Sequence, residues 1–104
     1  FEARQPYDAI WACASLLHVR RDDMREVFRR LSDGLTDGGI LYCSFKDGSD
    51  FIRDSRSFTC FSAELFANFI TRETSFSILE QFISEDVRPG RKTEYWINAI
   101  LQKQ

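Results

Sequence analysis

The stretch YDAIWACASLLHVRRDDMREVFRRLSDGLTDGGILYCSFK, residues 7–46, decides the fold. It opens at 7–13 on an apolar run with almost no alternation, which is typical of a strand buried on both faces. A helix is expected at about 22–35, where apolar residues recur at helical spacing and charged residues fill the other face. A second buried strand is expected at 39–46. Strand, helix and strand with short connections predict a right-handed crossover between two parallel strands.

Residues at both ends of this first helix suit helix termini. Asp23 and Glu26, three positions apart, predict a capping box at its start. Gly34, followed by the pair Gly38 and Gly39, is expected to stop the helix and turn the chain.

A polar, irregular loop is expected at 47–60, and a loop of this length inside a compact domain is more often functional than idle. A second helix is expected at about 62–72. Ser62 is a natural N-cap residue, and Phe61 before it is placed to pack against Phe66 as a hydrophobic staple.

Residues 75–84 and 94–102 alternate as two strands, and the connector 85–93 contains a Pro-Gly pair, so they predict a long-looped antiparallel hairpin. The expected order is β-α-β-α-β-β, in an α/β fold. No repeat, linker or low-complexity tract divides the chain, so residues 1–104 are expected to form a single domain.

The composition favours a globular protein without a nucleic-acid or membrane role. Hydrophobic residues make up 43% and charged residues 29% of the 104 residues, and the net charge is −2. No apolar run is long enough to span a bilayer. The basic residues of the first helix alternate with acids and are expected to form a solvated face. They are Arg20, Arg21, Arg25, Arg29 and Arg30.

The cysteine pattern predicts no metal site. Cys13, Cys43 and Cys60 are widely spaced, and the single histidine, His18, cannot complete a zinc set with them at a familiar spacing. Reduced, mostly buried thiols in a cytoplasmic protein are the expected state. Trp11 and Trp96 are expected in the core.

The order of elements and five short motifs resemble the C-terminal half of a class I S-adenosylmethionine-dependent methyltransferase, in a small bacterial, tellurite-resistance-like subgroup. The motifs are YDAIW at 7–11 with LLHV at 16–19, LTDGG at 35–39, SFKDG at 44–48, RPGR at 88–91, and EYWIN at 94–98. The resemblance implies strands four to seven of a doubly wound, Rossmann-like sheet that ends in an antiparallel hairpin. The Gly-rich loop and the ribose-binding acid of the family are absent, so this chain would be a partial domain that lacks the N-terminal cofactor-binding half.

The resemblance also implies S-adenosylmethionine as cofactor and a small-molecule methyl acceptor. The segment after the first strand would lie beside the reactive methyl group of the cofactor. The residues concerned are Ala12, Cys13, Ala14, Leu17 and His18. The structural alternative is that Cys13 and Leu17 belong to the core and that His18 caps local backbone.

Two further assignments follow from residue chemistry at this edge. His18 is the general-base candidate, because histidine is the side chain most often used in that role. Lys46 at the end of the second strand, with Arg53 and Arg56 on the following loop, could attract an anionic substrate. The alternative is a solvated loop whose basic side chains pair with its own acids.

The first strand would expose an edge where a missing strand should pair. That edge is expected to bind either a second copy, giving a homodimer, or the missing N-terminal half. The alternative to a methyltransferase fragment is therefore a non-catalytic half-domain that acts as a dimerising or partner-binding module.

Overall fold

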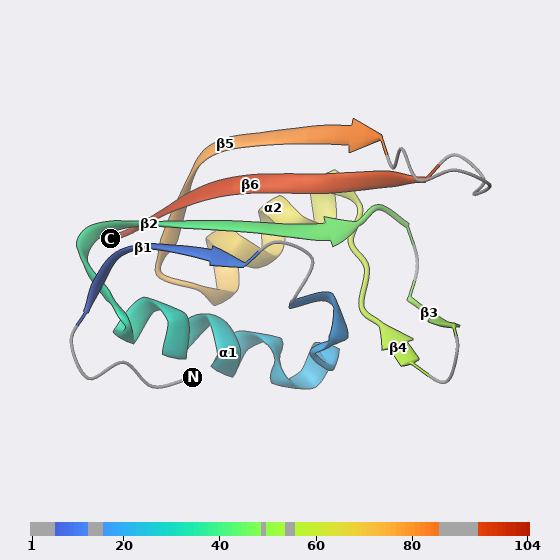
Figure 1. Ribbon diagram of the computed structural model, residues 1–104, viewed down its shortest axis with the longest axis horizontal. Helices are drawn as coiled ribbons and strands as arrows, with labels where there is room; N and C mark the ends of the chain where they lie inside the picture. Colours follow the sequence, from blue (N-terminus) through green and yellow to red (C-terminus); the bar gives the residue numbers. More distant parts are fainter. Residues whose placement is uncertain (1–5, 13–15, 49, 54–55, 86–93) are drawn as a thin grey trace.

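The computed structural model describes residues 6–12, 16–48, 50–53, 56–85 and 94–104. A mixed four-stranded sheet forms its centre, in the order β1-β2-β6-β5 (Figure 1). The strands are β1 (Tyr7–Ala12), β2 (Leu35–Lys46), β5 (Phe76–Glu85) and β6 (Tyr95–Lys103). β1 and β2 are parallel, whereas β6 is antiparallel to both of its neighbours. The predicted parallel pair and the final antiparallel hairpin are confirmed.

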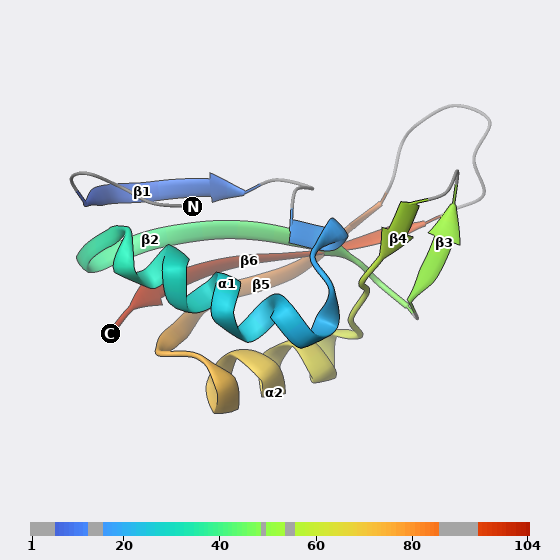
Figure 2. The same ribbon diagram turned by 90° about the horizontal axis from the view of Figure 1, so that it is seen from below.

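Two helices, α1 (Arg21–Asp33) and α2 (Ala63–Glu73), lie on one side of the sheet (Figure 2). The core lies between them and the sheet, because the apolar faces of both helices meet one face of the strands. Its largest fully buried side chains include Phe28 from α1, Phe66 from α2 and Phe45 from β2. No helix in the described part of the chain is long and apolar enough to cross a membrane.

The first helix differs from the sequence-based expectation at both ends. It begins at Arg21 behind Arg20, which makes no side-chain capping bond, so the predicted capping box is wrong. Glu26 bonds to Arg29 instead, at 2.5 Å. The helix ends at Asp33 with Gly34 as its C-cap. Leu35 was expected at the end of the helix, but it is the first residue of β2 and pairs with β1.

The second helix begins as expected. The Ser62 side chain accepts a hydrogen bond from the backbone N–H of Leu65 at 3.1 Å. The rings of Phe61 and Phe66 lie 5.5 Å apart, so the predicted hydrophobic staple is present.

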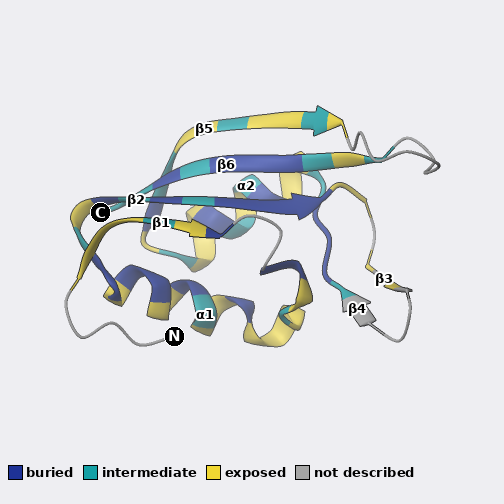
Figure 3. Ribbon diagram, in the orientation of Figure 1, coloured by how far each residue is buried: buried dark blue, intermediate teal, exposed yellow. Residues whose placement is uncertain are grey.

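Two predictions are wrong: one concerned the burial of β1, and the other the lack of regular structure at 47–60. β1 is largely exposed instead of buried on both faces, and Trp11 keeps 74% of its surface (Figure 3). The reason is that β1 lies at the edge of the sheet and, in the described part of the chain, both helices lie on one face of the sheet. The expected irregular loop at 47–60 contains a two-stranded hairpin, β3 (Phe51–Arg53) with β4 (Arg56–Phe58). Trp96, in contrast, is partly buried and packs against the core.

Candidate functional site

Three separate segments meet beyond the carboxyl ends of the parallel strands β1 and β2. The short 3₁₀ helix η1 (Leu16–His18) follows β1, and Thr59 donates its N–H to the carbonyl of Leu17 at 2.7 Å. The Thr59 hydroxyl also bonds to the carbonyl of Val19 at 2.7 Å. The N–H of Phe61 reaches the carbonyl of Lys46 at 3.2 Å. In sheets with parallel strands this edge is where ligands bind, because loops from adjacent strands converge there.

A hollow of about 440 Å³ opens at this edge, between the start of α1 and the β3–β4 hairpin. Charged residues form part of its lining, together with two apolar side chains and a threonine. The lining residues are Arg20, Arg21, Asp22, Asp50, Ile52, Phe58 and Thr59. A polar molecule with an apolar part is the kind of ligand that this lining suits.

Arg21 forms the contacts that connect the residues on one side of this hollow. Its guanidinium donates to Asp50 at 2.8 Å and to the carbonyl of Cys60 at 2.6 Å, and it lies 4.8 Å from the centre of the Phe61 ring. Asp50 also accepts the N–H of Cys60 at 2.8 Å. The hydrogen bond from Arg21 lowers the pKa of the Asp50 carboxyl below its ordinary value. No local sequence pattern indicates these contacts, because the bonded residues are 29 and 39 positions apart in the chain.

Of the residues expected beside the cofactor, Ala12, Leu17 and His18 are described by the structure. Ala12 and Leu17 are buried, and His18 is exposed with its ring 4.7 Å from that of Phe58. These three lie at the carboxyl edge of the sheet, as expected. Cys13 and Ala14 fall outside the described residues, as do the side chains of Arg53 and Arg56, although the backbones of these two arginines pair in the hairpin.

Lys46 was expected to attract an anionic substrate, but its side chain is buried and already paired. Its side chain is 5% exposed and forms an ion pair with Glu94. Its ammonium also lies 4.5 Å from the centre of the Trp96 ring. The positive charge of Lys46 is thus neutralised inside the protein, between the end of β2 and the start of β6.

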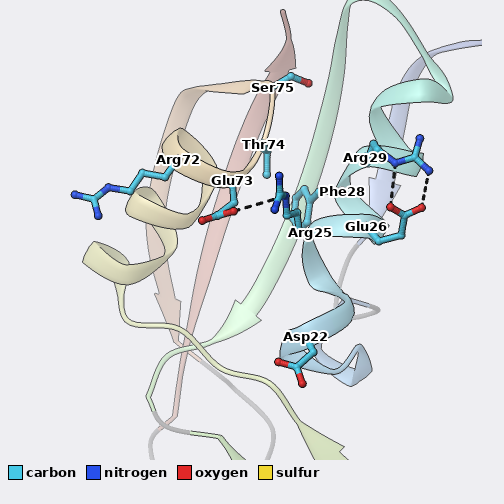
Figure 4. A pocket seen from close by; sticks show the side chains of 9 residues that line it. All are labelled: Asp22, Arg25, Glu26, Phe28, Arg29, Arg72, Glu73, Thr74 and Ser75. Atoms are coloured by element: carbon cyan, nitrogen blue, oxygen red, sulfur yellow. Dashed lines mark hydrogen bonds and ion pairs between the residues drawn. The ribbon is translucent and has the colours of Figure 1, made fainter.

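A second hollow lies between α1 and α2, and Figure 4 shows the side chains that line it. Its charges are largely paired with one another: Arg25 reaches Glu73 at 3.6 Å, and Arg29 bonds to Glu26. The expected neutralisation within the first helix is confirmed for Arg29 and Arg30, which pair with Glu26, whereas Arg25 pairs with Glu73 on α2 instead. Among the described residues, no group of three or more His, Cys, Asp or Glu side chains is placed to hold a metal ion.

The two described cysteines, Cys43 and Cys60, are buried free thiols, as expected. Burial raises the pKa of Cys43 to about 12 and that of Cys60 to about 11. Because the thiolate is the reactive form, neither residue is suited to act as a nucleophile.

The sequence matches no protein-family model and no curated protein significantly. Solved structures do match. A SAM-dependent methyltransferase from Methanosarcina mazei superposes with a TM-score of 0.79 at 15% identity, over 98% of this chain and 61% of that one. The 1,6-didemethyltoxoflavin-N1-methyltransferase of Burkholderia thailandensis superposes at 0.77 with 16% identity, over 100% and 46%. TehB from Haemophilus influenzae superposes at 0.70 with 14% identity, over 97% and 37%.

These superpositions define the fold: a mixed sheet with two helices, of the Rossmann-like type found in SAM-dependent methyltransferases. The chain spans between about a third and two thirds of the length of the three methyltransferases just compared.

The described residues among those expected beside S-adenosylmethionine lie at the carboxyl end of β1 and in η1. The side chains of Ala12 and Leu17 are buried in the core, and a Cβ at Gly48, whose φ is 130°, would meet no atom within 4 Å. No Gly-rich turn connects a strand to either described helix, since Arg20 precedes α1 and Ser62 precedes α2. A complete site of this kind needs a second wall.

Proposed function

We propose that this chain is part of an S-adenosylmethionine-dependent methyltransferase that acts on a small molecule, within the tellurite-resistance-like subgroup and in the cytoplasm. The observation that carries the proposal is the superposition of 98% of the chain, with its edge of convergent loops, on a SAM-dependent methyltransferase. The Burkholderia thailandensis enzyme was solved with S-adenosylhomocysteine and its acceptor bound, which supports a cofactor of the same kind here.

In this proposal the carboxyl edge of β1 contacts the cofactor. When bound, the cofactor supplies a methyl group that is activated by a positively charged sulfur. Ala12 and Leu17 would shape this side of the site through their backbone, because their side chains are buried in the core. His18 lies at the mouth with its ring against Phe58, where it can take a proton from an acceptor that must lose one.

The hollow beside His18 is the proposed acceptor site. Ile52, which is 76% exposed, and the half-buried Phe58 offer apolar contact, whereas Arg20 makes no ion pair among the described residues. An acceptor with an apolar body and an anionic group would satisfy both features. We therefore assign the anion-binding role to Arg20 in preference to Lys46, because the charge of Lys46 already faces Glu94.

The test is a titration of S-adenosylhomocysteine into the ¹⁵N-labelled chain, followed by amide chemical shifts. With one wall present, we expect millimolar binding, about −4 kcal/mol, with shifts confined to η1 and the residues next to Gly48. ATP, which shares the adenosine group but not the amino-acid part, is the control ligand and should cause smaller shifts there. No change at 10-fold the expected dissociation constant, or changes centred between α1 and α2, would refute the proposed site.

A further inference from the structure

We propose that a groove between α1 and α2 is the docking site for an acidic, amphipathic helix of a partner protein. The groove has a volume of about 370 Å³, with an apolar floor and a basic rim. We call it the helix groove and define it by Phe61, Leu65 and Phe69 of the floor and Arg21, Arg25 and Arg72 of the rim. It is separate from the proposed function, because of these six residues only Arg21 also lines the hollow assigned to the acceptor.

The spacing of residues on the two helices gives the groove its form. Leu65, Phe69 and Arg72 stand at i, i+4 and i+7 of α2, so they share one side of that helix. Arg21 and Arg25, four positions apart on α1, form the facing stripe. A third helix can lay its side-chain ridges into the groove between two such helices, which is a common mode of peptide recognition.

The apolar floor is fixed before any partner binds. The rings of Phe61 and Phe69 lie 5.6 Å apart, and Phe69 also lies 5.5 Å from Phe28 in the core. Leu65 beside them is 60% exposed. An apolar side chain of a partner would cover Leu65 and remove water from the half-buried Phe69. Because the floor is already ordered, little conformational entropy is lost on binding.

The charges around this floor favour an acidic partner. Among the described residues Arg72 forms no ion pair. Arg25 faces Glu73 at 3.6 Å, with 76% of its side chain exposed (Figure 4). Exposed pairs of this length contribute little, so a carboxylate of the partner can replace Glu73 at low cost. The whole chain carries a net charge of −2, so the basic rim is a local feature.

The same features favour a helix over three other occupants. A nucleic acid would stack its bases on exposed aromatic rings, but Phe61 is only 2% exposed and the exposed apolar residue is the aliphatic Leu65. A bilayer surface inserts protruding apolar side chains, whereas the two rings here form the floor of a groove. Two copies that met groove to groove would bring their arginine rims together, which is repulsive.

The test is a titration of the ¹⁵N-labelled chain with a synthetic helical peptide of about 12 residues, which spans the 11 residues of α2. This peptide carries leucine at helical spacing on one face and glutamate on the other. Two control peptides have glutamine or lysine in place of glutamate. We expect amide shifts confined to α2 and the start of α1. The glutamine peptide should bind about tenfold more weakly, and the lysine peptide should not bind.

Variants test the charge and the apolar contact separately. Arg25→Glu combined with Arg72→Glu should exchange the preference, so that the lysine peptide binds and the glutamate peptide does not. Arg30→Glu, which is exposed on α1 outside the groove, is the matched control and should leave the preference unchanged. Leu65→Ala should weaken binding of the glutamate peptide about tenfold. Leu79→Ala, at a similarly exposed position on β5, should not weaken it.

Several results would overturn the proposal. They are no binding of the glutamate peptide at ~1 mM, equal binding of the glutamate and lysine peptides, and shifts centred away from α2. Tighter binding to anionic phospholipid vesicles or to a single-stranded oligonucleotide than to the glutamate peptide would also overturn it, as would a dimer that occupies the groove without peptide. Titration with S-adenosylhomocysteine reports on η1 and the residues next to Gly48 instead, so either proposal can fail while the other stands.

Discussion

The ion pair between Lys46 and Glu94 predicts unequal costs when either partner is replaced. The Lys46 side chain is 5% exposed and that of Glu94 is 23% exposed. Glu94→Gln would leave an ammonium group deep in the protein without its carboxylate, although the Trp96 ring stays 4.5 Å from it. Lys46→Met would leave a carboxylate that still reaches water. Removal of Glu94 should therefore be the more damaging change.

The magnitudes follow from these surroundings. Breaking a buried pair by removing one partner costs about 3–5 kcal/mol, because a charge stays buried without compensation. The contact with Trp96 offsets about 1 kcal/mol of this. We expect Glu94→Gln to destabilise the fold by about 3 kcal/mol and Lys46→Met by about 1–2 kcal/mol. The double variant should cost less than Glu94→Gln alone, since no buried charge remains.

Urea unfolding followed by circular dichroism measures these differences. With a slope of about 1 kcal/mol/M for a chain of this size, Glu94→Gln should lower the midpoint by about 3 M. Glu80→Gln, an exposed position on β5, is the matched control and should change the midpoint little. Equal costs for the two single variants, or a Glu94→Gln midpoint like that of the control, would refute the reasoning.

Three further predictions concern local interactions. Ser62→Ala should cost about 1 kcal/mol by removing the N-cap of α2, whereas the control Thr71→Ala, in the last turn of the same helix, should be neutral or slightly stabilising; equal thermal midpoints would contradict this. Asp50→Asn should cost about 0.5 kcal/mol at pH 7, because its ion pair is half exposed. The folded-state pKa of Asp50 lies below the ordinary 3.8, so its contribution to folding stability is present above pH 3.8 and is lost as the pH falls through the folded pKa. A stability difference between the original protein and Asp50→Asn that persists in stronger acid would contradict this prediction. In native protein at pH 8, Cys43 and Cys60 should react with iodoacetamide at least ~100-fold more slowly than a free thiol. Alkylation of these two thiols in the native protein at the same fast rate as in urea would disprove their burial.

Local features of the fold could be predicted from the sequence. The helical spacing of apolar residues identified α1 and α2, and Ser62 and Phe61 marked the start of α2 correctly, because capping and stapling act within a few residues. Short connections predicted the parallel pairing of β1 with β2. The segment after β1 was placed at the ligand edge of the sheet by the same topological reasoning, although its role in cofactor binding remains a prediction.

Contacts between distant residues were decided by tertiary structure alone. Arg21 and Asp50 are 29 positions apart, and Lys46 and Glu94 are 48 apart, so no local pattern identifies either pair. An anionic substrate or, alternatively, acids nearer in sequence were the expected partners of Lys46, but the packing of β6 against β2 brings Glu94 to it instead.

The first strand also combines a feature that the sequence predicts with one that tertiary structure decides. The apolar run at 7–13 predicted an extended strand, since its composition suits β structure whatever lies beside it. Whether that strand is central or at an edge depends on which other segments pair with it, and whether its second face is covered depends on which helices pack there. The sequence by itself therefore determined the elements and their order. Only the tertiary structure decided that Trp11 lies exposed on an open sheet face, because exposure is set by neighbours and not by the residue.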